Sequence, residues 1–412
     1  MTEDLASRSV PAPAPARSPG SVAFADPGGV TSALSWSAPE LTAGLAWSAL
    51  TRTFAAEAAG LLGDQVKLHV NGEPVVDHGL WPTTDADAAG PAAWLDRQHT
   101  FGPDDDRFVY ARAVQEHDRT LFRTVVELLA PHLWRLGLPP GHVEVEVFHG
   151  AYRNTPGGIH REGCTNLHLV LAGRKSMHFW RGTDWVPAGT TVREDVEPES
   201  ELPEEYLPDL DRRSVAEHGH ALTATTGGGF FWRSGIWHVG ETHEPSVALN
   251  IASYTRTLDV GAKLLPLWGD RLHGEVPADW LADYREHVRS TGDDAAVLAR
   301  LTALGMRPAP PDAPGAVPRS VRRESSAPVL WSPAGPGRLT VAALGHAAEF
   351  ADGPAVRGWL AAVLTDRPAA REVPQECERL ARWLCAQRIL EPIPEASSDR
   401  IPGAIPDPME AS

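Results

Sequence analysis

The sequence predicts a mainly β fold with flanking helices, and three observations carry that prediction. Residues 143–148 alternate apolar and polar side chains, as a strand with one buried face does. His160 and Glu162 stand two residues apart, and His238 follows much later in the chain. Further apolar segments of strand length recur at 166–172, 177–180, 227–232 and 246–252. Strands in this number predict a core made mainly of β-sheet.

The three polar residues have the types of a metal centre with open positions. Residues i and i+2 of a strand face the same side, so His160 and Glu162 can both face into the barrel. His238 lies 78 residues after His160 (238 − 160), so only a folded sheet can bring it to the same metal. Two imidazoles and one carboxylate form the facial triad of non-haem Fe(II) sites, which leaves coordination positions open. Such a site suits an oxygenase better than a structural metal, whose ligands fill the coordination shell.

The residues that flank the triad follow a definite order. Gly157-Gly158 precede the first pair, and residues 166–175 read as strand, turn and lysine. Residues 227–229 are three glycines that lead into an apolar strand before His238, and a returning strand follows. This order resembles the JmjC-type, cupin-like 2-oxoglutarate oxygenases over residues 140–256. The motif alone would also fit three unrelated polar residues, because the chain has 17 His, but the flanks favour ligation.

The resemblance implies a double-stranded β-helix core that holds Fe(II), takes 2-oxoglutarate as cosubstrate and uses dioxygen for hydroxylation. Lys175 stands fifteen residues after His160, where the family places a basic residue for the distal carboxylate of 2-oxoglutarate. A cation suits this role because charge-assisted hydrogen bonds are strong. The alternative is an exposed turn lysine. Two positions depart from the family pattern: Glu162 stands where many protein hydroxylases have Asp, and Arg233 where proline is common.

Five further residues are candidates for the pocket. Asn166 and Asn250 are candidates for binding 2-oxoglutarate, Asn166 because it lies an even number of residues from the ligand pair. Tyr152, Arg161 and Trp237 are candidates for the substrate pocket. Trp237 adjoins a ligand, and its alternative is a core position. Three nearby residues are interpreted as structural: His168, His178 and Cys164.

Composition indicates a soluble globular protein. Of 412 residues, 42% are hydrophobic and 22% charged, and we find no 18-residue apolar run or signal peptide. The three Cys are expected as free thiols in a reducing cytoplasm. The net charge of −17 disfavours nucleic acid and leaves a peptide or protein as the expected partner. Many Ala, Arg, Pro and Trp residues indicate a GC-rich bacterial genome, so natural-product tailoring is one candidate role.

The chain divides into six expected segments. They are a disordered tail at 1–30, the catalytic domain with N-terminal helices at 31–256, a helical extension at 257–306, a Pro-rich linker at 307–328, a small α+β domain at 329–393 and a tail at 394–412. The small domain resembles, in order and size, the winged-helix module that ribosomal-protein hydroxylases of the JmjC group carry after the barrel. Its seven Arg and seven Asp plus Glu favour protein docking or dimerisation over DNA reading. Helices after such barrels often dimerise in similar proteins, so the extension is a candidate homodimer contact.

Local patterns predict individual elements. Asn71-Gly72, between two apolar segments, predicts a hairpin turn. Apolar residues at helical spacing predict a helix over 119–136. The acidic insertion 194–211 is expected as a solvated loop, and the alternative is a lid that recognises a basic substrate segment. Further expected elements are helices around 280–284, 297–301, 355–364 and 375–389, and a strand at 338–344.

The leading functional hypothesis is a hydroxylase acting on a side chain of a peptide or protein, including a natural-product peptide or a ribosomal protein. An oxidative demethylase would use the same cofactors. A non-redox cupin isomerase with Zn or Mn, and a cupin sensor or regulator, are alternatives from other classes. Lys175 argues against the isomerase, and the neutral C-terminal domain argues against the regulator. The sequence has no Walker-type loop, G-x-S-x-G or C-x-x-C, so nucleotide hydrolysis, serine hydrolysis and thiol redox chemistry have no anchor.

Overall fold

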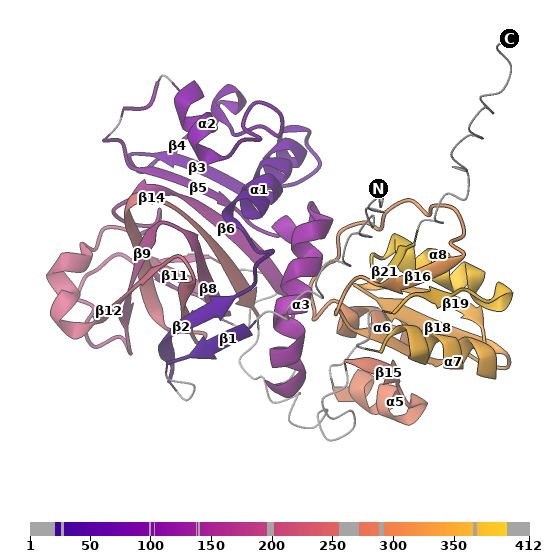
Figure 1. Cartoon of the computed structure of the whole chain (residues 1–412). Helices are drawn as coiled ribbons and strands as arrows, with labels where there is room; N and C mark the ends of the chain where they lie inside the picture. Colours follow the sequence, from indigo (N-terminus) through magenta and orange to yellow (C-terminus); the bar gives the residue numbers. More distant parts are fainter. Residues whose placement is uncertain are drawn as a thin grey trace, which may run out of the picture.

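The computed structural model shows a β-rich part up to Ser253, followed by a smaller C-terminal part (Figure 1). Within the described residues, no helix combines the length and the apolar character that a membrane span needs. The described residues are 21–25, 29–98, 100–102, 104–136, 138, 141–195, 202–254, 272–287, 292–365 and 369–393.

A large antiparallel sheet forms one wall of the β-rich part. Its strands follow the order β1-β2-β13-β8-β14-β6-β5-β3-β4. Their bounds are β1 Ser21–Phe24, β2 Thr31–Ser37, β13 Gly228–Trp232, β8 Thr165–Ala172, β14 Trp237–Ser253, β6 Val143–Tyr152, β5 Arg107–Ala111, β3 Val66–Val70 and β4 Glu73–Pro74.

A smaller set of strands faces this wall and shares β14 with it. The order is β12-β9-β14-β7-β11-β10. The first half of β14 pairs with β9 and β7, and the second half, after a register shift between Thr242 and Ser246, pairs with β6 and β8. The additional strands are β12 His220–Thr225, β9 Arg174–Trp180, β7 Ile159–Arg161, β11 Glu204–Leu207 and β10 Arg193–Asp195. Two sheets joined through a shared strand confirm the mainly β, jelly-roll core that the sequence predicts.

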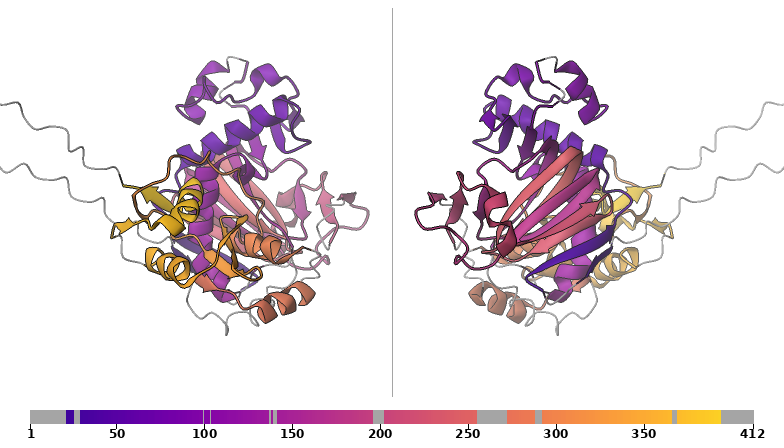
Figure 2. Two further views of the ribbon diagram at one scale, coloured as in Figure 1. Left: turned by 90° about the vertical axis from the view of Figure 1, so that its right-hand side faces the viewer. Right: turned by 90° about the vertical axis from the view of Figure 1, so that its left-hand side faces the viewer.

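Helices cover the outer face of the large sheet, as Figure 2 shows for α1 beside the barrel strands. The expected helix at 119–136 is confirmed as α3 (Arg119–Leu136), and its apolar face is buried. On β6, Val143, Val145 and Val147 join the same hydrophobic core as these helices. The glutamates between them therefore face the inside of the barrel. The remaining helices of this part are α1 Ala43–Ala58, α2 Pro91–Arg97, η1 His78–Leu80, η2 Val114–Glu116 and η3 Arg212–His218.

Near the N-terminus, the predicted hairpin turn is confirmed, but the predicted disordered tail has the wrong end. The Asn71-Gly72 hairpin turn is confirmed, with both residues at positive φ (53° and 86°) between β3 and β4. The tail expected at 1–30 is too long, because β1 (Ser21–Phe24) pairs with β2. Phe24 packs edge-on against Phe231 of β13, with ring centroids 5.4 Å apart, and this contact holds the short strand to the sheet. Residues 1–20 lie outside the described residues.

The C-terminal part contains a four-stranded sheet, β15-β17-β18-β19, and a three-stranded sheet, β20-β16-β21. The expected strand at 338–344 and the expected helices correspond to β18, α5, α6, α7, and η4 with α8. The bounds are β15 His273–Glu275, α5 Ala278–His287, α6 Asp294–Thr302, β16 Ser320–Arg323, β17 Val329–Pro333, β18 Arg338–Ala343, β19 His346–Ala351, α7 Pro354–Val363, β20 Arg371–Glu372, η4 Gln375–Cys377, α8 Glu378–Ala386 and β21 Leu390–Pro392. The winged-helix resemblance and the homodimer contact stay predictions.

The boundaries of this part differ from the expected ones. β16 lies inside the expected linker at 307–328, yet it pairs with β20 and β21. β15 belongs to the expected helical extension, yet it pairs in parallel with β17. The guanidinium of Arg119 on α3 donates to the carbonyl oxygens of Pro310 (2.8 Å) and Ala386 (3.0 Å). These contacts anchor the segment to the β-rich part instead of leaving it as a free linker. Residues 255–271, also in the expected extension, lie outside the described residues.

Gly173, between β8 and β9, tests the packing of that turn, and Gly182, which follows β9, serves as the comparison. Gly173 has φ +76°, and a Cβ there would lie 2.5 Å from the carbonyl oxygen of Pro245, beside the irregular part of β14. Gly182 has φ +64° with nothing within 4 Å. We expect Gly173→Ala to lower the free energy of unfolding by about 3 kcal/mol or more. Gly182→Ala, which adds only backbone strain, should lower it by about 1–2 kcal/mol. Chemical denaturation measures both, and equal losses would contradict this turn packing.

Candidate metal centre and its cavity

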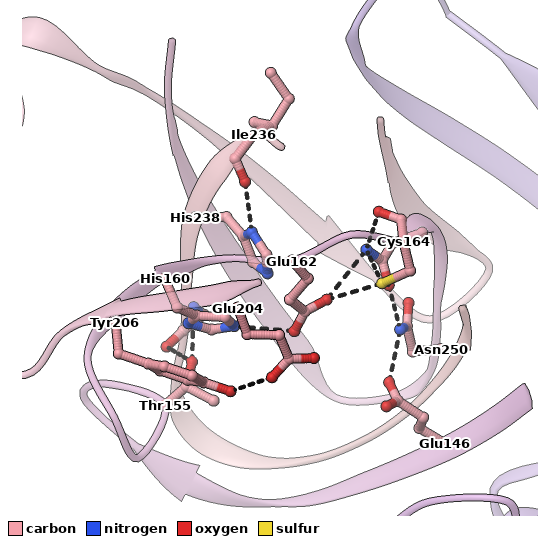
Figure 3. A network of polar contacts seen from close by, with 12 residues as sticks. Glu146, Thr155, His160, Glu162, Cys164, Glu204, Tyr206, Ile236, His238 and Asn250 are labelled. Carbon is pink, nitrogen blue, oxygen red and sulfur yellow. Dashed lines mark hydrogen bonds and ion pairs between the residues drawn. The ribbon is translucent and has the colours of Figure 1, made fainter. Parts of the chain in front are cut away.

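His160, Glu162 and His238 converge at one point inside the barrel (Figure 3). One ligand atom from each lies within 4.8 Å of the others. His160 is on β7, Glu162 follows that strand directly, and His238 is on β14, where it pairs in register with His160. The pairing of β14 with β7 therefore brings His238 next to His160 and Glu162, although it lies far from them in the sequence. Within the described residues, this is the one such cluster of His, Cys, Asp and Glu.

Backbone contacts select the nitrogen that each imidazole offers. His160 Nδ1 lies 2.9 Å from the carbonyl oxygen of Gly158, and His238 Nδ1 lies 2.9 Å from that of Ile236. A carbonyl only accepts, so each Nδ1 carries a proton and donates it. The neutral rings then present their Nε2 lone pairs to the cavity. Contacts of this kind orient metal-binding histidines in proteins.

Burial and mutual charge shape the ionisation of the triad. Burial and the neighbouring His160 lower the pKa of His238 to about 4. Burial also opposes protonation of His160, but the Glu162 carboxylate outweighs it and raises the pKa of that ring. Burial alone would raise the pKa of Glu162, but the hydrogen bond with His160 holds it well below its ordinary value. At neutral pH the site therefore contains an ionised carboxylate, as a cation requires.

The two oxygens of Glu162 have different partners. Oε1 lies 3.3 Å from His160 Nε2, on the side where the ligand atoms gather. Oε2 accepts a hydrogen bond from the Cys164 thiol at 3.0 Å, with the Asn166 amide at 3.5 Å. Burial and the nearby Glu162 keep the pKa of Cys164 well above its usual range, so this thiol stays a donor. Cys164 is buried, as expected for a small residue, but it also contacts the ligand, a role that sequence reasoning missed. The signal was its spacing of two residues from Glu162.

The glycine pair before β7 permits a further strand to approach the ligands. Gly158 has φ +77°, and a Cβ there would lie 2.8 Å from the carbonyl oxygen of Leu207. β11 pairs with β7 so that Tyr206 stands opposite His160, and their rings stack with centroids 5.4 Å apart. Glu204, whose carboxylate accepts from the Tyr206 hydroxyl at 2.6 Å, lines the cavity with it. Part of the acidic insertion is thus a wall of the site rather than a solvated loop. Residues 196–201 lie outside the described residues.

Lys175 lies deep in the same cavity, which has a volume of about 310 Å³. Its side chain is only 2% exposed, in contrast to a turn lysine. The ammonium donates to the Tyr152 hydroxyl at 2.8 Å and lies 4.6 Å from the centre of the Phe148 ring. Gly240 leaves room for this chain, because a Cβ there would lie 3.3 Å from Lys175 Cε. Burial lowers the pKa of Lys175 to about 7, which Glu146 partly offsets.

Asn166 and Asn250 line the cavity and form a chain of hydrogen bonds across the large sheet. Figure 3 shows its Asn250–Glu146 end. The Asn250 amide donates to Asn166 Oδ1 at 2.6 Å and to Glu146 Oε2 at 2.7 Å. The Tyr110 hydroxyl donates to Glu146 Oε1 at 2.5 Å. Sequence reasoning missed Glu146 and Tyr110. The alternation of residues 143–148 contained the signal, because it places the glutamates together on one strand face.

The three residues expected in the substrate pocket divide into two groups. Tyr152 accepts a hydrogen bond from Lys175. Arg161 and Trp237 do not line the cavity; they stack on each other, with the guanidinium carbon 4.8 Å from the ring centre. Each is one residue from a ligand, and strand alternation turns it to the opposite face. Trp237 belongs to a hydrophobic cluster there, as its alternative reading proposed.

The two histidines expected as structural also differ from each other. His168 is buried and lines the cavity on β8. His178 points away from it, and its Nε2 lies 2.9 Å both from Glu241 and from the guanidinium of Arg212. This contact joins η3 to the small sheet.

Comparison with known proteins gives weak similarities only. No family model and no curated protein matches the chain. Among solved structures, Escherichia coli ycfD is 14% identical, with 81% of this chain and 89% of that chain covered and a TM-score of 0.40. YcfD, described as a ribosomal oxygenase, in complex with cobalt and succinic acid gives 14% identity, the same coverages and a TM-score of 0.37. An L-ribose isomerase from Cellulomonas parahominis gives 15%, coverages of 37% and 63%, and a TM-score of 0.20. At these values the function has to be argued from the site itself.

The hydrogen bond from Cys164 to Glu162 predicts a measurable effect on metal binding. We expect Cys164→Ala to weaken Co(II) or Fe(II) binding about 10–100-fold, because Oε2 loses its donor and the carboxylate is free to rotate. Cys164→Ser keeps a donor and should retain most of the affinity. Metal titration measures the dissociation constants, with Cys385→Ala on α8 as the control. Unchanged affinity in Cys164→Ala would show that this contact does not hold the ligand.

Proposed function

We propose that this chain is an Fe(II)- and 2-oxoglutarate-dependent oxygenase that hydroxylates a side chain of a peptide or protein. One observation carries the proposal: a triad of His160, Glu162 and His238 shares a cavity with the buried cation of Lys175. A metal centre alone would fit many reactions. A buried ammonium beside it calls for an anionic partner, because an isolated charge in such a place is costly.

The donor set fits ferrous iron. Two neutral imidazole nitrogens and one carboxylate oxygen are the ligands of the facial triad, and this arrangement leaves positions open for other ligands. The buried thiol of Cys164 donates to Glu162 and stays protonated, so it does not complete a thiolate site. Iron held there, together with 2-oxoglutarate and dioxygen, supplies the oxidising power for hydroxylation.

The protein's own residues supply orientation and exclude water. Lys175 and the Tyr152 hydroxyl offer donors to the distal carboxylate of 2-oxoglutarate at one end of the cavity. Phe148 and Met177 line this end and keep it apolar. In low-dielectric surroundings, a charged hydrogen bond is stronger than in water. The Trp232 ring lies beside the imidazole of His238, with ring centroids 4.8 Å apart, and shields this ligand from water.

A second cavity supports a substrate larger than a small metabolite. It has a volume of about 520 Å³ and is lined by polar loop residues of the β3–β4 hairpin, of 153–158 and of 208–213. It shares His69, Phe108 and Thr155 with the metal cavity, so the two adjoin. A side chain can therefore reach the metal while the adjoining chain occupies the second cavity. Hydroxylation and oxidative demethylation differ only in the carbon attacked, and mass analysis of the product separates them.

The absorption of the anaerobic Fe(II) protein during titration with 2-oxoglutarate tests the proposal without a known substrate. We expect a saturable metal-to-ligand charge-transfer band in the visible range. His160→Ala and His238→Ala should abolish it, whereas His220→Ala, an exposed histidine on β12, should not. Bound iron without a band would favour a non-redox cupin isomerase or sensor. Absence of iron binding would show that the triad is not a metal site.

Removing the buried cation predicts a loss of cosubstrate affinity. We expect Lys175→Ala to raise the dissociation constant for 2-oxoglutarate about 10–100-fold, because a charged hydrogen bond inside the cavity is lost. The same titration measures it, and iron affinity serves as the control that the triad is intact. An unchanged constant would place the cosubstrate carboxylate elsewhere.

The depressed pKa of Lys175 predicts a pH dependence. Below pH 7 the ammonium is charged in the free cavity, and above its pKa of about 7 it loses its proton. A dicarboxylate binds the charged form, so binding above this pH must also take up a proton. We therefore expect the affinity for 2-oxoglutarate to fall as pH rises from about 7 toward 9. Lys175→Ala should lack this inflection; the same decline in the variant would assign it to another group.

A further inference from the structure

A chain of hydrogen bonds crosses four neighbouring strands of the large sheet and ends at a candidate metal ligand. Its members are Tyr110 on β5, Glu146 on β6, Asn250 on β14 and Asn166 on β8, in the strand order of the sheet. Asn250 stands opposite Glu146 in the register, so their side chains share one face. His168, opposite Asn250 on β8, also hydrogen-bonds the Asn250 side chain. Buried polar chains in which the members hold one another are rigid, so the far end of this one can influence the ligand.

The direction of the chain follows from the acceptor at its start. Both oxygens of Glu146 accept hydrogen bonds, and Oε2 accepts from the Asn250 amide at 2.7 Å. Asn250 must therefore present its nitrogen to Glu146, and the same nitrogen donates to Asn166 Oδ1 at 2.6 Å. An amide that accepts with its oxygen on one side offers its N–H groups on the other. Asn166 consequently points its nitrogen away from Asn250, toward Cys164 and Glu162.

The Asn166 nitrogen has acceptors on this second side. It lies 3.3 Å from the carbonyl oxygen of Cys164, 3.3 Å from Cys164 Sγ and 3.5 Å from Glu162 Oε2. The Cys164 thiol in turn donates to Glu162 Oε2 at 3.0 Å. If Asn166 turned its oxygen to this side, the thiol would gain a competing acceptor and the carbonyl would face another oxygen. The orientation of the Asn166 amide therefore decides how firmly Cys164 holds the candidate ligand.

Ionisation of Glu146 does not change the direction of the chain. Burial, together with Glu144 and Glu162, raises the pKa of Glu146 to about 8. A proton on the carboxyl group fits on Oε1, because the Tyr110 hydroxyl, at 2.5 Å, can accept it, whereas an amide nitrogen cannot. Oε2 therefore remains an acceptor for Asn250 in either state.

We propose that Glu146 is a positioning residue for the candidate metal site. Through Asn250 it fixes the orientation of the Asn166 amide. That amide keeps the Cys164 thiol directed at Glu162, which is thereby oriented for the metal. Glu146 acts at a distance, because the bonds from Glu146 to Asn250, to Asn166 and to Glu162 lie in series. The inference rests on the proposed function, since it takes Glu162 as a ligand of the iron.

Two neutral substitutions of Glu146 separate its acceptor oxygen from its charge. Glu146→Gln keeps an oxygen for Asn250 and can turn its nitrogen to the Tyr110 hydroxyl, whereas Glu146→Leu removes the acceptor at similar volume. Because Co(II) titration measures metal affinity directly, it compares the two variants. We expect Glu146→Leu to weaken Co(II) binding about 3–10-fold, less than the roughly 10–100-fold typical when a direct contact to a ligand is lost. Glu146→Gln should bind Co(II) as tightly as the wild-type protein.

The S–H stretching band of Cys164 in the metal-free protein is the second readout, because its frequency rises when the hydrogen bond of the thiol weakens. Cys164→Ala assigns the band among the three thiols of the chain. We expect Glu146→Leu to shift the band to higher frequency and Glu146→Gln to leave it in place. A general loss of stability would not produce this pair of results. Asn250→Leu breaks the chain one step nearer the ligand, so it should reproduce the result and serves if Glu146→Leu does not fold.

Glu349→Leu is the matched control, because Glu349 is paired with Arg338 in the C-terminal part, away from the chain of hydrogen bonds. It should change neither readout. Wild-type affinity or an unmoved S–H band in Glu146→Leu, or an equal loss in Glu146→Gln, would each overturn the inference. Failure of the wild-type protein to bind Co(II) would instead overturn the proposed function and the inference with it, so the two failures are distinguishable.

Discussion

The pairing of β14 with both sheets is the constraint on which the site depends. One continuous strand brings His238 opposite His160 in its first half and Asn250 opposite His168 in its second half. Because His238 and Asn250 lie on the same strand, the distance between the candidate metal site and the polar residues of the large sheet is set by strand geometry. The register shift between Thr242 and Ser246 lets the strand change partners without losing its hydrogen bonds over either half. Close turns such as Gly173 against Pro245 are then needed to accommodate the bend.

The second organising feature is the placement of buried charge. The cavity contains both a lysine, Lys175, and a carboxylate, Glu146. Neither belongs to a close ion pair among the described residues, although the charge of Glu146 partly offsets the lowering of the pKa of Lys175 by burial. A protein core tolerates such groups poorly unless a ligand completes them. These buried charged groups distinguish the cavity from an inert cleft.

The contacts of Glu162 illustrate how the surroundings of a metal ligand define its chemistry. One oxygen faces the histidines, and the other is held by Cys164 and Asn166. Both histidines are in turn held by carbonyl groups of their own loops. All three ligands are therefore oriented before a metal arrives. Glutamate has one more rotatable bond than aspartate, and the additional contacts compensate for that freedom.

Much of the core was predictable because strand periodicity is local. The ligand pair, the turn at Asn71-Gly72 and the helix Arg119–Leu136 each follow from spacing within a few residues. The errors arose where pairing partners lie far apart. The short strands Ser21–Phe24 and Ser320–Arg323 show little hydrophobic periodicity. They form because they pair with neighbouring strands. Arg161 and Trp237 were misplaced for another reason, since proximity in sequence was given more weight than strand parity.

By itself, the sequence determined the types of the candidate metal ligands, the strand face of the first two and the presence of a lysine after them. These properties depend on side-chain chemistry and on the two-residue period of a strand. Only the tertiary structure decided that Lys175 is buried, that Cys164 holds Glu162, and that Glu146 lines the same cavity. Those facts depend on which strands lie side by side and in which register. Register is set by the burial of whole faces across the sheet, a property that no short stretch of sequence contains.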